Sequence, residues 1–444
     1  MKRQLLIISV LLFSMMGYSQ GIAFEHGTWK DVLEKAKQTN KPVFVDVYTS
    51  WCGPCKMMSK DIFPLAEVGA VYNANFVCYQ VDAEKGEGVE IAKKYEVKAY
   101  PTYLFIKPDG TLFSLAIGSM PVKDFISVSN TAIADMNDPK PLTVWDKEYA
   151  GKKNDPGFLL DYMNKRSKLG KSNALLLDEY LKLLPEERRT SDTIIRFYQK
   201  EEHYLNVNSL AYTNLLKNKD EFYKKLYENV YTYLYDGVVY SVKEAAKSKD
   251  EQLLHAAIQA FDKTHKNPLR MSKDELYMDY YKRTRDSVTY LKYTCDFCNN
   301  DLMNISTDSI KKKDRESLQQ IEKAIQSGAL AVMDSANRAQ VKEYSAHLWR
   351  NTISEKLNNI AWDVFLTVSD INVLQDALRW SKRSLEIYPN NPEWTDTYAN
   401  LFYKLGKKEE AIAKEEEAVQ YAGKDQKKGF EETVTKMKSG VKTW

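Results

Sequence analysis

Residues 43–56, VFVDVYTSWCGPCK, decide the fold of the amino-terminal part of this chain. The first six are apolar at nearly every position and rich in β-branched and aromatic side chains, which predicts a strand buried on both faces. Asp46 interrupts this strand, and a buried carboxylate costs free energy unless it has a partner or a role. The segment therefore predicts a buried strand, followed by a helical segment that carries Cys52 and Cys55 one turn apart.

The flanking sequence predicts further strands and helices in alternation. Residues 24–40 place Trp29, Val32, Leu33 and Ala36 on one face of a helix. Strands are predicted at residues 43–48, 76–82, 100–106 and 111–117. Helices are predicted at residues 24–40, 89–95 and from Val122 onward. The order β-α-β followed by β-β-α predicts one sheet between layers of helices.

Three features together carry a resemblance to a known family. They are Asp46 six positions before the first cysteine, the WCGPCK motif at residues 51–56, and the step Tyr100-Pro101-Thr102 before a strand. In this combination, residues 24–135 resemble the thioredoxin family, and most of all its exported members with an extended first helix. A lone Cys-x-x-Cys is a weak signal because zinc sites also contain it, but no second pair lies nearby with zinc-finger spacing. The resemblance implies an α/β thioredoxin-like domain over residues 20–138.

The resemblance also implies a thiol–disulfide oxidoreductase site with Cys52 and Cys55 as its redox-active disulfide. Cys52 is expected at the start of a helix, where unpaired N–H groups favour the thiolate that attacks a substrate. Cys55 would resolve the mixed disulfide, and Asp46 would lie beneath it as its general base. An inert structural disulfide and an ordinary satisfied carboxylate at Asp46 are the alternatives.

The substrate-binding residues that the resemblance implies surround these cysteines. Gly53 would permit the tight turn and Pro54 would stiffen it, and this Gly-Pro pair resembles that of reducing thioredoxins. Trp51 would cover the disulfide as an apolar lid. Pro101 resembles the family's cis-proline, which presents the Tyr100 backbone to a substrate chain, with a trans proline at an edge strand as the alternative.

Cys78 marks a departure from the family pattern. Thioredoxins often carry a lysine on the second strand, four residues before the position of Asp82, and this chain has Cys78 there. The thiol is expected either to be a small buried hydrophobe or to point toward Asp46 and modulate the active site.

Residues 1–19 have the pattern of a secretory signal peptide. Lys2 and Arg3 form a basic start, an apolar run covers residues 5–16, and small residues flank the tyrosine of the triplet at 17–19. The run is too short to span a bilayer stably, which disfavours the alternative of an uncleaved membrane anchor. We therefore expect export to the periplasm and a soluble protein after cleavage, in a compartment that permits disulfides.

Helical periodicity dominates the chain beyond residues 138–141. This segment contains two prolines and is the strongest candidate for the linker between the α/β domain and the helical region. Apolar and aromatic residues recur at helical spacing, as at Phe158, Leu159 and Tyr162, and are interpreted as core packing rather than a cofactor site. This pattern predicts a helical region over residues 139–345 made of stacked antiparallel pairs.

The end of the chain predicts repeats. Residues 391–424 resemble a tetratricopeptide unit, and residues 361–389 repeat the scheme more loosely. The expected architecture is thus an α/β domain followed by an all-α helical-repeat region, with tetratricopeptide-like repeats over residues 346–424. A capping helix is predicted over residues 425–444, with a membrane-surface helix as its alternative. Its apolar stripe consists of Phe430, Val434, Met437, Val441 and Trp444.

The net charge and the histidine spacing argue against nucleic-acid binding and metal binding, whereas a second Cys-x-x-Cys motif has several interpretations. The net charge of +3, which falls to +1 without Lys2 and Arg3, excludes a strong electrostatic footprint for nucleic acid. The five histidines show no metal-ligand spacing, so neither a metal site nor a cofactor is expected. Cys295 and Cys298 form a second Cys-x-x-Cys between predicted helical segments. They are interpreted as a structural or incidental pair, with a redox relay or a metal site as alternatives.

Two functional hypotheses follow. The first is an exported thiol–disulfide oxidoreductase that reduces or isomerises protein disulfides, with its helical region recruiting the substrate or a redox partner. The family resemblance implies an electron donor for such a protein, such as a membrane reductase. The second is an interaction protein in which the thioredoxin fold serves mainly for docking. The intact WCGPC motif, Asp46 and Pro101 disfavour the second, because docking needs none of them.

Overall fold

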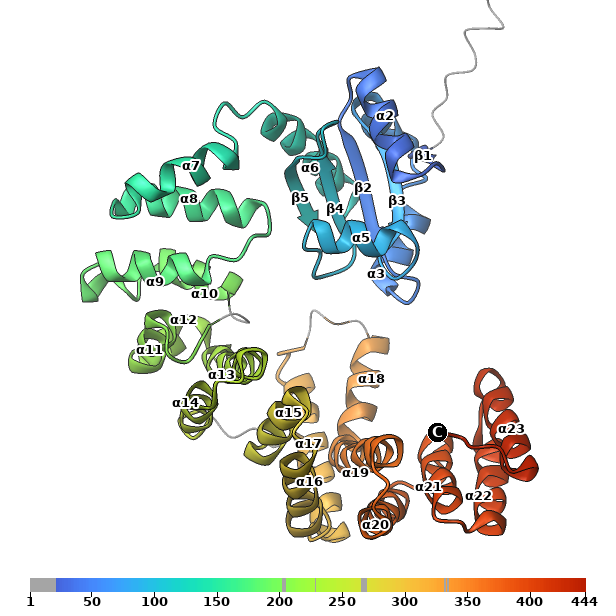
Figure 1. Cartoon of the computed structure of the whole chain (residues 1–444). Helices are drawn as coiled ribbons and strands as arrows, with labels where there is room; N and C mark the ends of the chain where they lie inside the picture. Colours follow the sequence, from blue (N-terminus) through green and yellow to red (C-terminus); the bar gives the residue numbers. More distant parts are fainter. Residues whose placement is uncertain (1–20, 202–204, 228, 265–269, 331–332, 334) are drawn as a thin grey trace, which may run out of the picture. The chain divides into compact units, whose positions relative to one another are not determined.

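The computed structural model describes residues 21–444 except 202–204, 228, 265–269, 331–332 and 334 (Figure 1). The predicted signal peptide lies outside the described residues. The chain forms two compact units, one of Met1–Leu205 with Ser209–Tyr233 and one of Asn206–Asn208 with Leu234–Trp444. Among the described residues, no helix combines the length and the apolar character that crossing a bilayer requires.

A five-stranded sheet lies at the centre of the amino-terminal domain. Its order is β1-β3-β2-β4-β5, so that β2 is flanked on both sides. The strands β1 and β2 run parallel to β3, whereas β4 is antiparallel to both β2 and β5. The strands are β1 Phe24–Glu25, β2 Val43–Tyr48, β3 Val77–Asp82, β4 Thr102–Ile106 and β5 Leu112–Ile117. The prediction that residues 43–48 form a buried strand is confirmed.

Helices cover both faces of this sheet (Figure 1). On one face, α2 and α5 pack against the valines of β2. On the other face, α4 and α6 pack around Phe44, whose ring lies 4.7 Å from that of Tyr72 and 6.1 Å from that of Phe125. The helices are α2 Trp29–Thr39, α3 Gly53–Met57, α4 Ala66–Asn75, α5 Glu87–Lys94 and α6 Val122–Met136. A π-helical turn, η1 Met58–Ile62, continues α3.

The first helix begins later than its apolar pattern predicts. It starts at Trp29 rather than at residue 24, because the Thr28 hydroxyl accepts a hydrogen bond from the Asp31 N–H and Asp31 bonds back to the Thr28 N–H. This capping box fixes the helix start. Phe24 and Glu25 pair instead with β3 as a short parallel strand.

The first unit continues after the linker as a set of helices. The linker residue Asp138 forms an ion pair with Lys165 of α8, and α7 begins directly after Pro141. Trp145 of α7 and Phe158 of α8 pack with ring centroids 5.2 Å apart. These helices are α7 Leu142–Lys152, α8 Pro156–Lys168, α9 Ala174–Leu183, the short η2 Glu186–Arg188, α10 Asp192–Glu201, α11 Leu210–Lys217 and α12 Lys219–Leu226. The helix α13, Asn229–Ser248, leads into the second unit.

Every described element of the second unit is helical, which confirms the predicted fold class of an α/β domain followed by a helical region. Its main core gathers Trp380, Phe365 and Leu357. The helices are α14 Glu251–Phe261, α15 Lys273–Thr284, α16 Ser287–Asp296, the π-helical η3 Phe297–Leu302, α17 Thr307–Gln326, α18 Ser335–Ala346, α19 Leu348–Thr367, α20 Ile371–Ile387, α21 Pro392–Lys404, α22 Lys408–Tyr421 and α23 Lys424–Ser439.

The last helix is shorter than predicted. It ends at Ser439 because Gly440 adopts a left-handed conformation with φ of 77° and caps it. Val434 and Met437 are buried as the apolar stripe predicts, whereas Val441 lies beyond the helix and is exposed. Trp444 folds back to place its ring 5.9 Å from that of Phe365 and 6.3 Å from that of Tyr403.

Candidate active site

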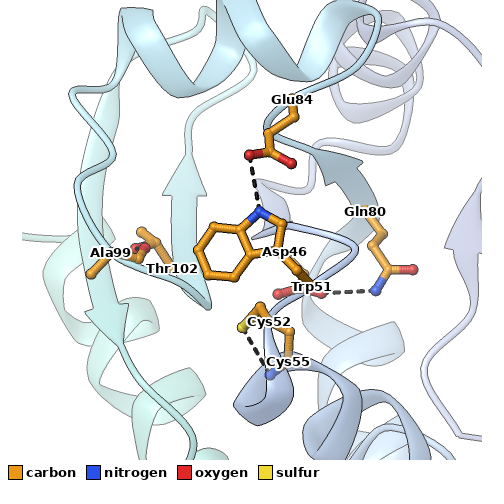
Figure 2. Close-up of a disulfide and its surroundings, with 8 residues drawn as sticks. All are labelled: Asp46, Trp51, Cys52, Cys55, Gln80, Glu84, Ala99 and Thr102. Carbon is orange, nitrogen blue, oxygen red and sulfur yellow. Dashed lines mark hydrogen bonds between the residues drawn. A yellow bond between two sulfur atoms is a disulfide. The ribbon is translucent and has the colours of Figure 1, made fainter. Parts of the chain in front are cut away.

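The two cysteines of the WCGPCK motif form a disulfide at the start of α3 (Figure 2). Cys52 is the N-cap of this helix, and its Sγ accepts a hydrogen bond of 3.1 Å from the Cys55 N–H. Pro54 occupies the first turn, where its missing N–H costs no helical hydrogen bond. Both cysteines are nearly buried, with 4% of Cys52 and 6% of Cys55 exposed. The predicted position of Cys52 at a helix start is therefore confirmed.

Trp51 lies beside this disulfide, as Figure 2 shows, and its ring contacts that of Tyr100. The Trp51 side chain is 65% exposed, and its ring meets that of Tyr100 edge-on at 6.0 Å. Its indole N–H donates to the Glu84 carboxylate at 3.0 Å, which fixes the ring on the surface. The Tyr100–Pro101 peptide bond is cis, so the alternative of a trans proline is wrong. An exposed aromatic surface thus borders the two sulfur atoms.

Asp46 is the buried carboxyl group of the site. Only 2% of the residue is exposed, and its neighbours across the sheet are Gln80 on β3 and Tyr103 on β4. Gln80 Nε2 donates to Asp46 Oδ2 at 2.8 Å, whereas Oδ1 is buried without a hydrogen-bond partner among the described residues. Burial raises the pKa of Asp46 from 3.8 to about 7, although the Gln80 bond acts in the opposite direction. Asp46 can therefore gain or lose a proton near neutral pH.

A cavity of about 200 Å³ connects Cys55 with the amide that binds Asp46. Gln80 and Cys55 both line this cavity. The buried Thr49 also lines this cavity, and its Oγ1 has no hydrogen-bond partner among the described residues. The remaining lining residues are Tyr48, Ser50, Lys56 and Ser59.

Comparison with known proteins identifies the family of this domain. A family model described as a thioredoxin-like domain matches residues 29–133. A thioredoxin of Mycoplasmoides gallisepticum is 35% identical over 97 residues, which cover 22% of this chain and 90% of that protein. The chain belongs to the thioredoxin family. A thioredoxin H-type of Oryza sativa subsp. indica is 40% identical over 90 residues, which cover 20% of this chain and 66% of that protein.

These matches cover only part of this chain. The solution structure of a putative disulphide-isomerase from Bacteroides thetaiotaomicron is 39% identical and covers 95% of that chain but only 26% of this one, with a TM-score of 0.25. The match spans between 42% and 66% of the length of four plant relatives. Each of these matches covers between 18% and 26% of this chain.

Cys78 of the thioredoxin domain is not the residue paired with Asp46 across the sheet. In the parallel register of β2 and β3 it is opposite Phe44, and Gln80 is the residue opposite Asp46. Cys78 is 2% exposed within the aromatic cluster around Phe44, where burial raises the pKa of its thiol to about 12. Of the two alternatives for Cys78, the register and the burial agree with a small buried hydrophobe.

The second cysteine pair lies inside a continuous helical stretch, not between helices. Cys295 belongs to α16 and Cys298 to the π-helical η3, which Trp380 holds through a bond of 2.9 Å from its indole N–H to Asn299. Both thiols are free, and burial is the main cause that raises the pKa of each. Within the described residues, no group of three His, Cys, Asp or Glu side chains could hold a metal ion.

Sequence reasoning missed two residues of the site, Gln80 and Glu84. Gln80 lies opposite Asp46 because of the register of the parallel pair β2 and β3, and the sequence of β3 alone does not fix that register. Glu84 follows β3 in a turn, and no periodic pattern indicates that its carboxylate reaches the Trp51 indole.

Proposed function

We propose that this protein is an exported thiol–disulfide oxidoreductase that reduces or isomerises disulfides in protein substrates. The observation that carries the proposal is the Cys52–Cys55 disulfide, with Cys52 as the N-cap of α3. The N–H groups at this helix start favour a thiolate, which is the reactive form of cysteine. The buried Asp46 and the cis-proline at 101 complete the constellation that the family resemblance implies.

The reaction that these residues support is thiol–disulfide exchange in two steps. The Cys52 thiolate attacks one sulfur of a substrate disulfide, and the other substrate sulfur leaves as a thiolate. Cys55 then loses its proton to Asp46 and attacks Cys52 Sγ, which releases the second substrate sulfur. The substrate gains two electrons, and the Cys52–Cys55 pair is oxidised to the disulfide seen in the structure. In isomerisation, a thiolate of the substrate itself attacks the substrate sulfur of the mixed disulfide after the first step, so that a new substrate disulfide forms and Cys52 leaves as a thiolate.

The substrate chain is proposed to lie along the exposed aromatic surface beside the disulfide. Trp51 offers an exposed ring, and the ring of Tyr100, the residue before Pro101, meets it edge-on. Gly53 has no atom within 4 Å of the position of a side chain, so a substrate can approach the motif there. This surface supports binding of an extended peptide rather than a small molecule.

Export and partners are further parts of the proposal. Residues 1–19 are proposed to direct the chain to the periplasm, where a reducing pair needs an electron donor such as a membrane reductase. The helical region is proposed to recruit protein substrates or a redox partner, with tetratricopeptide-like repeats over residues 346–424. The support for such repeats is that the helices α19 to α22 follow one another with short connections.

Reduction of insulin disulfides by the full chain tests the proposed activity. With dithiothreitol as the electron source, we expect the wild-type protein to accelerate insulin precipitation and Cys52→Ser to lose this acceleration completely. Cys295→Ser is the matched control and is expected to keep it, because Cys295 belongs to the helical region. Equal rates for wild type and Cys52→Ser would contradict the proposal and favour a docking role.

A further inference from the structure

We propose that Gln80 is a positioning residue that holds one oxygen of the Asp46 carboxyl group, so that the other oxygen receives the proton of Cys55. This inference rests on the thiol–disulfide function proposed above. In the step concerned, the Cys55 S–H bond breaks and its proton moves to Asp46 Oδ1. The Cys55 thiolate then forms a bond with Cys52 Sγ while the bond between Cys52 and the substrate sulfur breaks, and the substrate leaves as a thiolate.

The contacts of Asp46 divide its two oxygens into different roles. Oδ2 accepts the Gln80 amide at 2.8 Å, and the parallel register of β2 and β3 fixes the two residues opposite each other. Oδ1 is buried and has no hydrogen-bond partner among the described residues. A buried oxygen without a donor loses the hydration it has in water, so it gains most from accepting a proton. The free oxygen is therefore the one suited to act as the base.

The position of Gln80 also connects Asp46 with Cys55. Its side chain borders the cavity of about 200 Å³ that Cys55 also lines, and this volume accommodates several water molecules. Hydroxyl groups of Thr49, Ser50 and Ser59 add hydrogen-bonding partners along the wall. Removal of the amide would free the carboxyl group to rotate and would open a larger space beside it.

Gln80 acts on Asp46 without adding a charge. The titratable groups on this side are Tyr103 on β4, which lies opposite Asp46, and three residues that line the cavity, Tyr48 of β2 and Cys55 and Lys56 of α3. Burial and the Gln80 bond are the causes that shift the pKa of Asp46. A neutral amide keeps the carboxyl group a base near neutral pH, whereas a cation at the same place would favour the ionised form and lower its pKa.

The test separates the two steps with 5,5′-dithiobis(2-nitrobenzoic acid) as the disulfide, used in a single turnover with the reduced full chain. Attack by Cys52 releases the first thionitrobenzoate, and attack by Cys55 releases the second. We expect Gln80→Leu to slow the second release about tenfold and to move its pH midpoint upward. Gln80→Lys is expected to move the midpoint downward. The first release stays unchanged in both variants, and Gln38→Leu on the exposed side of α2 leaves both releases unchanged.

Two further variants make the outcomes unambiguous. Cys55→Ser measures the background release of thionitrobenzoate by the three cysteines outside the WCGPCK motif. Asp46→Asn measures the rate of the second release without the proposed base. The inference is overturned if Gln80→Leu and Gln80→Lys keep the wild-type rate and midpoint of the second release while Asp46→Asn slows it. If Gln80→Leu does not fold, Gln80→Glu replaces it, because a second carboxylate beside Asp46 is expected to move the midpoint upward while Gln80→Lys moves it downward. Failure of the proposed function has another signature, because the wild-type protein then gives no second release above the baseline.

Discussion

Cys55→Ser is expected to convert the protein from a catalyst into a trap for its substrates. Serine at this position cannot attack Cys52 Sγ, so the mixed disulfide between Cys52 and a substrate persists until an external thiol breaks it. We expect turnover to fall by more than about a hundredfold while the first attack continues. After incubation with a disulfide-bonded protein, the variant should run almost entirely as a higher-mass mixed disulfide on a non-reducing gel. Dithiothreitol should reduce this species and restore the original band.

The expected trap has a simple control. The double variant with Cys52→Ser and Cys55→Ser should form no such species, because the remaining cysteines are buried or half-buried and burial raises the pKa of each thiol. Equal trapping by the double variant would show that another thiol attacks the substrate, and would contradict the proposal that Cys52 is the attacking thiol.

Asp46→Asn is expected to stabilise the thioredoxin domain above neutral pH. The folded-state pKa of about 7 lies above the ordinary value of 3.8, so the folded protein holds a proton that the unfolded chain has already released. The stabilising effect of this proton is complete below pH 4 and is lost as the pH rises to about 7. Above that pH the ionised, buried Asp46 costs up to about 4 kcal/mol, which the neutral asparagine avoids.

Hydrogen exchange of the β2 and β3 amides measures this effect in the full chain, because a protein with two compact units does not unfold in one step. The difference in opening free energy between Asp46→Asn and wild type should be small near pH 4 and largest near pH 8. Asp61→Asn, at an exposed carboxyl group, should show little difference at either pH. A difference that does not change with pH would contradict the raised pKa of Asp46.

The sheet could be predicted from the sequence because its strands bury both faces. The apolar run at residues 43–48 has no helical period, and the structure confirms it as the central strand β2. β1 escaped prediction because two residues carry no periodicity of their own and pair only through β3. The start of α2 depends on the side-chain bonds between Thr28 and Asp31, which the apolar pattern does not contain.

The parts of the candidate site that lie close together in the sequence could be predicted. Contacts between residues on different strands were harder to predict, because strand register determines which side chains meet. Cys52 and Cys55 fall one turn apart on any helix that begins at the motif, and the structure places them there. Gln80 reaches Asp46 because of the pairing of β2 with β3, and the same pairing directs Cys78 toward Phe44. Distances across a sheet depend on register, which a single sequence leaves open by a residue or two.

The reduction potential of the Cys52–Cys55 pair tests the central claim most directly. The full chain is equilibrated with mixtures of reduced and oxidised dithiothreitol, and the thiols that become accessible to an alkylating reagent are counted by mass. We expect one reversible two-electron transition near about −270 mV, the value typical of thioredoxin. This transition should be absent from Cys52→Ser. A potential near −120 mV would contradict a reducing role, and the absence of any transition in the wild-type protein would contradict redox activity at this site.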